Sequence, residues 1–269
     1  MTPNTSSERV DQLVNRSERI YDAIDPHFDS EPRYRRMLRF GVNTVALSLR
    51  SGKSIAEASK PLVTLPNVLA RQRGPLDALA NTYADVERAT VDRNGERETD
   101  SRHAIHLMKL AVPYAREFYP RLNQNKVATY ALLHDIVEAY AGDVASLGIS
   151  PEQAKEKHKN EMQALATLRA EYGNDWPEFV STIENYEALS DIESQYVKTF
   201  DKLDPGFTHL QNKGVELKNG FGLSKEGFIT AIGQTTQRMA TYSSDFPQLM
   251  EDREELMRRV AEATFQKAA

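Results

Sequence analysis

The sequence predicts an all-α protein. Apolar residues recur at the three- and four-residue spacing of helices through most of the 269 residues, and prolines and glycines separate these runs. No stretch shows the sustained alternation of a β-strand, and there is no internal repeat or low-complexity tract. A chain of this length has room for one or two domains and a substantial core.

The first 80 residues have helical patterns but no recognisable chemistry. Residues 8–24 and 33–49 each predict an amphipathic helix, while prolines between 54 and 73 predict short helices or turns. The arginines between 33 and 39 could contact phosphate, but a solvated helix face explains them better. We expect residues 1–80 to form an N-terminal helical extension and residues 81–269 to form the main domain.

The main domain continues the helical pattern, with one charged break. Residues 76–91 predict a helix, and residues 92–102, dense in charges and turn formers, predict a loop. Residues 206–225 are rich in glycine and predict an excursion or lid. Other helices are expected over about 101–118, 125–141, 151–172, 226–242 and 247–267, and Gly142 is the expected C-cap of the second of these. A further helix is expected to begin at residue 176. Another should begin at a capping box formed by Ser190 and Glu193 and end at Pro205.

Charge and composition exclude several classes of protein. With 34 Lys and Arg against 39 Asp and Glu, the net charge of −5 argues against a nucleic-acid-binding or anionic-membrane-binding protein. The chain has no cysteine, so disulfides and thiolate metal ligands are excluded. No apolar run approaches the ~20 residues of a membrane span, and the N-terminus does not resemble a signal peptide. We therefore expect a cytoplasmic protein.

An adjacent His134-Asp135 pair interrupts an apolar helical run. Buried charges need a partner, which can be an ion pair or a divalent metal. His103 and Asp201, from two other predicted helices, would complete a set of two nitrogen and two oxygen donors. Such a set suits one divalent ion: Mn, Fe, Co, Ni, Mg or Zn. Glu138 lies one helical turn after His134 and would project into the same space.

The order of these residues matches a known pattern. Residues 133–143 read L-H-D-I-V-E-A-Y-A-G-D, and residues 197–204 read V-K-T-F-D-K-L-D. Together with His103, Glu98 five residues before it, and Tyr186-Glu187, they resemble the HD-domain metal-dependent phosphohydrolases. Within that superfamily the chain is most similar to the bacterial 5′-deoxynucleotidases and their eukaryotic relatives. The resemblance spans about residues 76–217 and implies an HD-domain helical bundle.

The resemblance also implies roles for individual residues. Glu138 would orient or deprotonate the attacking water, and Asp143 would hold the substrate sugar or a metal ligand. Ala89 departs from the bacterial enzymes, which have a Trp after the early Arg, and so removes an aromatic wall. The implied metal ligands are His103, His134, Asp135 and Asp201, and the implied phosphate and sugar contacts are Arg88, Arg93 and Asn94.

Two residues near the predicted ligands leave alternatives open. His106 shares a helix face with His103, so it could bind a second metal, but a core position or a place behind the ligands is favoured. Asp204 could replace Asp201 as a ligand. The resemblance and the position of Asp204 next to Pro205 favour Asp201.

We therefore expect a phosphohydrolase that removes the 5′-phosphate of a small nucleotide, a (deoxy)nucleoside monophosphate. Nucleoside triphosphate (dNTP) or alarmone hydrolysis is an alternative, although Glu138-Ala139 stands where alarmone hydrolases have Glu-Asp. A non-catalytic nucleotide sensor or scaffold is an alternative of another class, which the N-terminal extension favours. We expect a homo-oligomer, with a dimer favoured.

Overall fold

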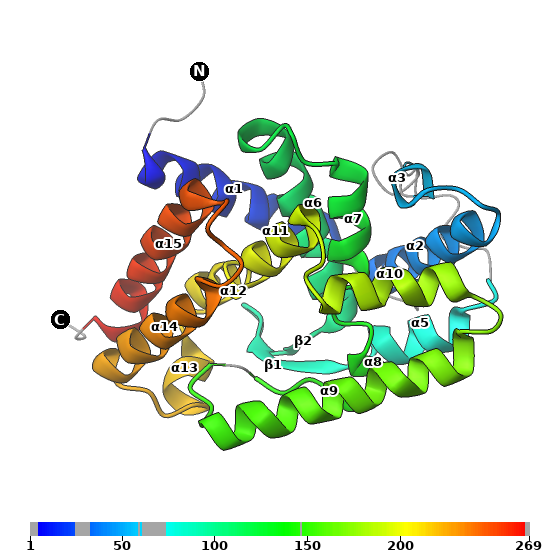
Figure 1. Cartoon of the computed structure of the whole chain (residues 1–269). Coiled ribbons are helices and arrows are strands. Elements are labelled where there is room, and N and C mark those ends of the chain that lie inside the picture. Colours follow the sequence, from blue (N-terminus) through cyan, green and yellow to red (C-terminus); the bar gives the residue numbers. More distant parts are fainter. Residues whose placement is uncertain (1–4, 25–32, 59, 61–73, 146, 267–269) are drawn as a thin grey trace.

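Helices form most of the chain, as the sequence predicts (Figure 1). The computed structural model describes residues 5–24, 33–58, 60, 74–145 and 147–266. The helices are α1 (Ser6–Ile24), α2 (Arg33–Arg50), α3 (Ile55–Ala58), α5 (Asp77–Ala84), α6 (Asp100–Phe118), α7 (Gln124–Leu133), α8 (Glu138–Ala141), α9 (Pro151–Tyr172), α10 (Pro177–Glu187), α11 (Ile192–Asp201), α12 (Pro205–Gln211), α13 (Val215–Asn219), α14 (Lys225–Met239) and α15 (Pro247–Phe265).

Helix α6 is the central helix, because it packs against α1, α2, α5, α7 and α11. It begins after Thr99, whose backbone is extended, and Asp100 in its first turn complements the helix dipole. Neighbours on several sides bury most of its length, including the polar residues of its first two turns. The helix therefore carries His103 and His106 into the interior of the bundle.

The N-terminal helices pack into the same core as the rest of the chain. Helix α1 lies along α15 and reaches α6, whereas α2 contacts α5, α6, α7 and α10 (Figure 1). The buried Arg9 donates to Asp252 of α15 at 2.7 Å, and Tyr114 of α6 donates to the same carboxylate at 2.6 Å. The two predicted helices are thus confirmed. Pro61 and Pro66 lie outside the described residues, and the domain boundary at residue 80 stays a prediction.

A β-hairpin replaces part of a predicted helix and loop. Strand β1 (Glu87–Val91) pairs antiparallel with β2 (Arg97–Thr99). The expected helix over 76–91 is therefore confirmed only as α5, and the expected loop over 92–102 only for the turn at residues 92–96. The reason is the Asn94-Gly95 dipeptide, a strong hairpin signal. Gly95 adopts φ +85°, and the Asp92 carboxylate accepts the N–H of Asn94 at 2.8 Å. The hairpin places β1 beside the first turn of α6.

The helix predicted over 125–141 is interrupted at the His-Asp pair. Helix α7 ends at Leu133, residues 134–137 form turns, and α8 follows as a single turn. Gly142 ends α8 with φ +71°, and its N–H donates to the carbonyl of Glu138 at 2.8 Å, which confirms the expected C-cap. The break gives His134 and Asp135 a turn geometry instead of a regular helix.

The later helices follow the prediction with local shifts. Asp191, not Ser190, is the N-cap of α11. It forms a capping box with Ser194. The predicted excursion over 206–225 contains two short helices, α12 and α13, and Pro205 begins α12 instead of ending α11. Residue 267, the expected end of the last helix, lies outside the described residues.

Candidate metal centre and adjoining pocket

Four side chains from three parts of the chain converge near the N-terminal end of α6. His103 Nε2 lies 3.1 Å from His134 Nε2 and 3.1 Å from Asp201 Oδ1. Asp135 Oδ2 lies 2.8 Å from His134 Nε2. The four donor atoms all lie within 4.8 Å of one another. The structure therefore brings together all four residues predicted to bind a metal.

The donor set fits a divalent metal ion. Ligand atoms about 2.0–2.2 Å from one metal lie roughly 3.0–3.5 Å from their neighbours, which agrees with the contacts around His103. Two imidazoles and two carboxylates suit a first-row divalent ion or Mg²⁺. All four residues are mostly buried, so their charges need a counterion. A divalent cation at this point would compensate Asp135 and Asp201.

The remaining ring nitrogens fix the orientation of both histidines. His134 Nδ1 donates to the carbonyl of Ala131 at 3.0 Å, and His103 Nδ1 donates to Asp204 Oδ2 at 3.0 Å. Each bond leaves Nε2 facing the cluster with its lone pair available to a metal. Asp204 therefore supports a ligand instead of competing with Asp201 for the metal.

His106 lies behind the cluster. Its Nδ1 donates to Asp204 Oδ1 at 2.9 Å, and its Nε2 lies 2.9 Å from Ser17 Oγ of α1. The ring stacks on Tyr21 with centroids 4.2 Å apart. Both nitrogens are thus engaged by protein groups, which agrees with the favoured place behind the ligands.

The charges of the cluster reinforce one another in the metal-free protein. Burial and Arg88 oppose protonation of His103, but its hydrogen bonds to Asp201 and Asp204 raise its pKa to about 10. Burial opposes ionisation of Asp201, yet Lys202 and the two histidines lower the pKa of this carboxyl well below its usual range. The carboxylates are therefore ready for a cation, whereas the histidines must lose protons to bind a metal.

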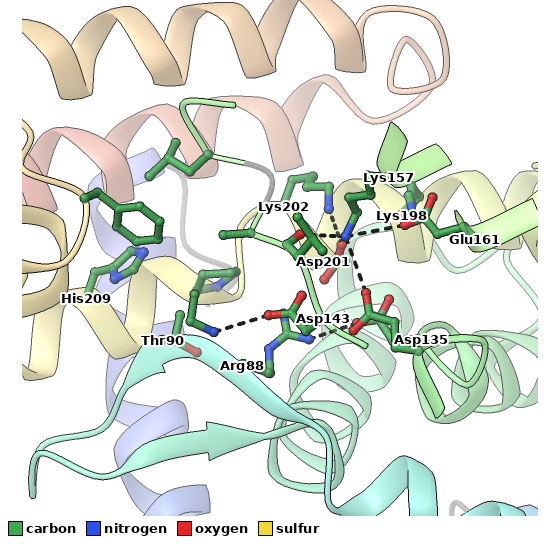
Figure 2. Close-up of a pocket in the computed structure, with 17 residues that line it drawn as sticks. Arg88, Thr90, Asp135, Asp143, Lys157, Glu161, Lys198, Asp201, Lys202 and His209 are labelled. Carbon is green, nitrogen blue, oxygen red and sulfur yellow. Dashed lines mark hydrogen bonds and ion pairs between the residues drawn. The ribbon is translucent and has the colours of Figure 1, made fainter. Parts of the chain in front are cut away.

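A pocket of about 680 Å³ opens over Asp135 and Asp201. Figure 2 shows β1 forming one wall, with Arg88 facing Asp135 and with Asp201 and Lys202 on the opposite side. The cationic side chains that line the pocket are Arg88, Lys157, Lys198 and Lys202, and the carboxylates are Asp135, Glu138, Asp143, Glu161 and Asp201.

Glu138 lines the pocket and is 4% exposed. Lys157 Nζ lies 3.5 Å from its Oε1, whereas Oε2 is buried and has no hydrogen-bond partner among the residues that the structure describes. Burial, followed by the charges of Asp135 and Asp100, raises the pKa of this carboxyl well above its usual range. A raised pKa makes this carboxylate a stronger base than an exposed glutamate.

Arg88 and Asp143 meet the pocket from β1 and from the loop after α8. Nη1 of Arg88 donates to Asp135 Oδ2 and to Asp100 Oδ1, both at 2.9 Å. Burial is the main cause that raises the pKa of Asp100 to about 7, although Arg88 opposes it. Asp143 Oδ2 accepts the backbone N–H of Ala89 at 3.2 Å and so fixes the strand.

The structure does not bring Arg93 and Asn94 to the pocket. Both lie in the turn of the hairpin, where Arg93 pairs with Asp22 of α1 at 2.6 Å. Neither residue lines the pocket, so neither belongs to the proposed site. The hairpin, which the sequence prediction lacked, is the reason for this difference.

Sequence reasoning gave no role to the lysines of the pocket. Lys198 and Lys202 are four residues apart around Asp201, and this spacing was a signal that could have found them. Lys157 had no such signal, because it reaches the pocket only through the packing of α9 against α8. His209 of α12 also lines the pocket and pairs with Glu216.

The fold and the four-ligand cluster define an α-helical protein with a candidate divalent-metal centre. The chain belongs to the HD domain family, because the family model for the HD domain matches residues 82–241. The expected superfamily and fold class are confirmed. Among the described residues, no helix is long and apolar enough to cross a membrane.

Curated relatives carry the name 5′-deoxynucleotidase. Human 5′-deoxynucleotidase HDDC2 is 29% identical over 132 residues, which cover 48% of this chain and 62% of that protein. The 5′-deoxynucleotidase YBR242W of Saccharomyces cerevisiae is 27% identical over 111 residues, 37% of this chain and 43% of that protein. The matches thus span less than two thirds of these relatives.

One solved structure has a similar fold. The crystal structure of a predicted metal-dependent phosphohydrolase from Magnetospirillum magnetotacticum MS-1 aligns with a TM-score of 0.50 and 22% identity. The alignment covers 67% of this chain and 91% of that chain. At this identity the likeness is evidence for the fold alone.

Proposed function

We propose that this protein is a metal-dependent phosphohydrolase that removes the 5′-phosphate of (deoxy)nucleoside monophosphates. The observation that carries the proposal is the buried Oε2 of Glu138, which has no hydrogen-bond partner within the described part of the chain and lies in a pocket also lined by Asp135 and Asp201. A carboxylate in this position suits general-base catalysis beside a metal. The relatives named as 5′-deoxynucleotidases support the choice of substrate class.

The metal ligands in this proposal are His103, His134, Asp135 and Asp201. A divalent ion held by them would add positive charge near the phosphoryl group and make a nearby water more acidic. Their burial keeps most of the bulk water away from the ligand atoms, which strengthens the charge interactions at the site.

Other residues of the pocket would supply the general base and the contacts to the substrate. Glu138 would take the proton of the attacking water at Oε2, and burial, which raises its pKa, makes it a stronger base than an exposed glutamate. Arg88 would donate to the phosphate, and Lys202, which pairs with Asp201 at 2.8 Å, lies near enough to add positive charge. Asp143, held by the N–H of Ala89, would accept a sugar hydroxyl.

Hydrolysis of a panel of nucleotides tests this proposal. The protein is supplied with Mn²⁺, Co²⁺ or Mg²⁺ and incubated with nucleoside 5′-monophosphates, triphosphates and an alarmone, and products are identified by chromatography. Nucleoside and inorganic phosphate from a monophosphate are the expected products. Release of triphosphate or pyrophosphate instead would favour the alternative hydrolases, and thermal stabilisation by nucleotides without any product would favour a sensor. A homodimer and a cytoplasmic location stay predictions from the sequence.

A further inference from the structure

Helix α1 reaches the back of the metal centre through two buried residues. Ser17 and Tyr21 are four residues apart, so they lie one turn apart on the same face of the helix. They are 0% and 2% exposed, and this face packs against α6. Helix α1 lies outside residues 82–241, which match the HD domain. A segment beyond the matched region therefore contributes polar atoms to the core of the site.

A continuous chain of hydrogen bonds joins Ser17 to the predicted ligand His103. Ser17 Oγ lies 2.9 Å from His106 Nε2, and His106 Nδ1 lies 2.9 Å from Asp204 Oδ1. Asp204 Oδ2 then accepts from His103 Nδ1 at 3.0 Å. All four residues are almost fully buried, so solvent does not replace these contacts.

Each hydrogen bond in this series has a defined donor and acceptor. When the Ser17 hydroxyl donates to Nε2 of His106, the proton of that ring is on Nδ1 and points at Asp204. Asp204 is then held by one donor on each oxygen. It keeps the proton of His103 on Nδ1, and Nε2 of His103 is left to bind the metal.

Tyr21 extends the same support to the pocket wall. Its ring stacks on His106 with an interplanar angle of 13°, and its hydroxyl lies 2.9 Å from Thr208 Oγ1 and 3.2 Å from Glu98 Oε1. Glu98 also accepts from Thr90, which lines the pocket, at 2.8 Å. One side chain of α1 thus contacts both the histidine network and the β-hairpin.

We propose that Ser17 and Tyr21 make the N-terminal helix a part of the metal centre, as positioning residues that set the orientation of His103 through His106 and Asp204. This inference rests on the proposed metal centre. A helix that only covered the core would need apolar contacts at these positions, whereas both hydroxyls are directed at polar groups that lead to the site.

Metal affinity measured with Co²⁺ tests the proposal without an activity assay. Dissociation constants and visible absorption spectra of bound Co²⁺ are compared for Ser17→Ala, Ser17→Thr, Tyr21→Phe and the exposed neighbour Glu18→Ala in the full chain. Asp204→Asn and His103→Ala serve as references. Unfolding temperatures of the metal-free variants show whether each one folds.

Loss of a group that bonds directly to a metal ligand commonly weakens metal binding about 10–100-fold, which we expect for Asp204→Asn. Ser17→Ala acts at a greater distance, so a weakening of roughly 3–10-fold with an altered Co²⁺ spectrum is expected. Tyr21→Phe keeps the ring that stacks on His106 and removes only the hydroxyl bonds to Thr208 and Glu98, so its loss should be smaller. Ser17→Thr, which keeps the hydroxyl, should restore most of the affinity, and Glu18→Ala should match the wild type.

Three results would separate the possible failures. If Asp204→Asn weakens Co²⁺ binding but folded Ser17→Ala and Tyr21→Phe bind like Glu18→Ala, helix α1 only packs and the inference is overturned. If His103→Ala also leaves Co²⁺ binding unchanged, the proposed metal centre itself is wrong. Equal losses in Ser17→Ala and Ser17→Thr would show that packing, not the hydroxyl, is responsible, and would also overturn the inference.

Discussion

Nη1 of Arg88 lies 2.9 Å from Oδ2 of Asp135, so a guanidinium from the hairpin touches a predicted metal ligand. The same nitrogen holds Asp100, which is fully buried. Arg88 therefore has two roles in this account, because it compensates buried carboxylates and faces the pocket where phosphate would bind.

Replacement of Arg88 by Ala should affect both stability and catalysis. Removal of one partner from a buried ion pair commonly costs about 3–5 kcal/mol, and we expect a loss at the lower end because Arg88 borders the pocket. The double variant Arg88→Ala/Asp100→Asn should recover part of this loss without recovering phosphate release. Urea unfolding and phosphate-release assays measure the two effects. Equal stability of the single and double variants would contradict the role of Asp100.

Arg93→Ala should leave KM for the nucleotide unchanged within about twofold. The side chain is paired with Asp22 in the hairpin turn and does not line the pocket, so its loss removes an exposed pair worth only about 0–1 kcal/mol. Steady-state kinetics beside Arg88→Ala provide the comparison. A large increase in KM for Arg93→Ala would mean that the hairpin turn reaches the substrate.

Metal removal should lower the unfolding temperature, because a ligand that binds only the folded state stabilises it. At a free metal concentration 100 times Kd the gain is about 2.7 kcal/mol, which for a chain of this size corresponds to roughly 5–10 °C. Differential scanning fluorimetry with a chelator and with added Mn²⁺ measures this shift. The shift should disappear in Asp201→Asn, and a full shift in that variant would place the metal elsewhere.

Asp191 gives a prediction of pH dependence away from the metal centre. Its carboxylate caps α11 and accepts from Lys126 at 2.6 Å. Burial opposes ionisation, but the hydrogen bonds from Lys126, the Ser194 N–H and Tyr130 outweigh it and lower the pKa of Asp191. A carboxyl with a lowered folded-state pKa stabilises the protein above its unfolded-state pKa, and this contribution is lost as the pH falls through the folded-state value.

Two substitutions distinguish the contribution of Asp191 as an N-cap from the contribution of its charge to stability. Asp191→Ala should cost about 1–2 kcal/mol at pH 7, whereas Asp191→Asn keeps an N-cap acceptor and should lose less. The difference between the wild type and Asp191→Asn should shrink as the pH falls below about 4. Urea unfolding from pH 7 to pH 3 tests this, and a difference that grows toward acid would refute it.

The cluster of His103, His134, Asp135 and Asp201 could be predicted because the order of these residues along the chain follows a known pattern. The same reasoning placed Glu138 and Gly142 correctly beside them, although the chain turns at His134 where a continuous helix was expected. Local features with a fixed backbone geometry, such as a glycine C-cap, can be predicted from the sequence alone.

Other features depended on contacts between distant segments. The Asn94-Gly95 turn was a local signal that was missed, and it moved Arg93 away from the pocket. Ser17 and Lys157 carry no signature at all, because only the packing of α1 on α6 and of α9 on α8 brings them to the site. Residues such as Ser17 and Lys157 can be assigned to the site only once the tertiary structure is known.

The rate of phosphate release by Glu138→Gln at saturating nucleotide and metal tests the proposed general base directly. Loss of a general base should lower kcat about 10²–10⁴-fold, while Co²⁺ affinity and the unfolding temperature stay close to those of the wild type. Glu156→Gln, an exposed carboxylate on α9 outside the pocket, is the matched control and should keep full activity. A Glu138→Gln enzyme that releases phosphate at the wild-type rate would contradict the central claim.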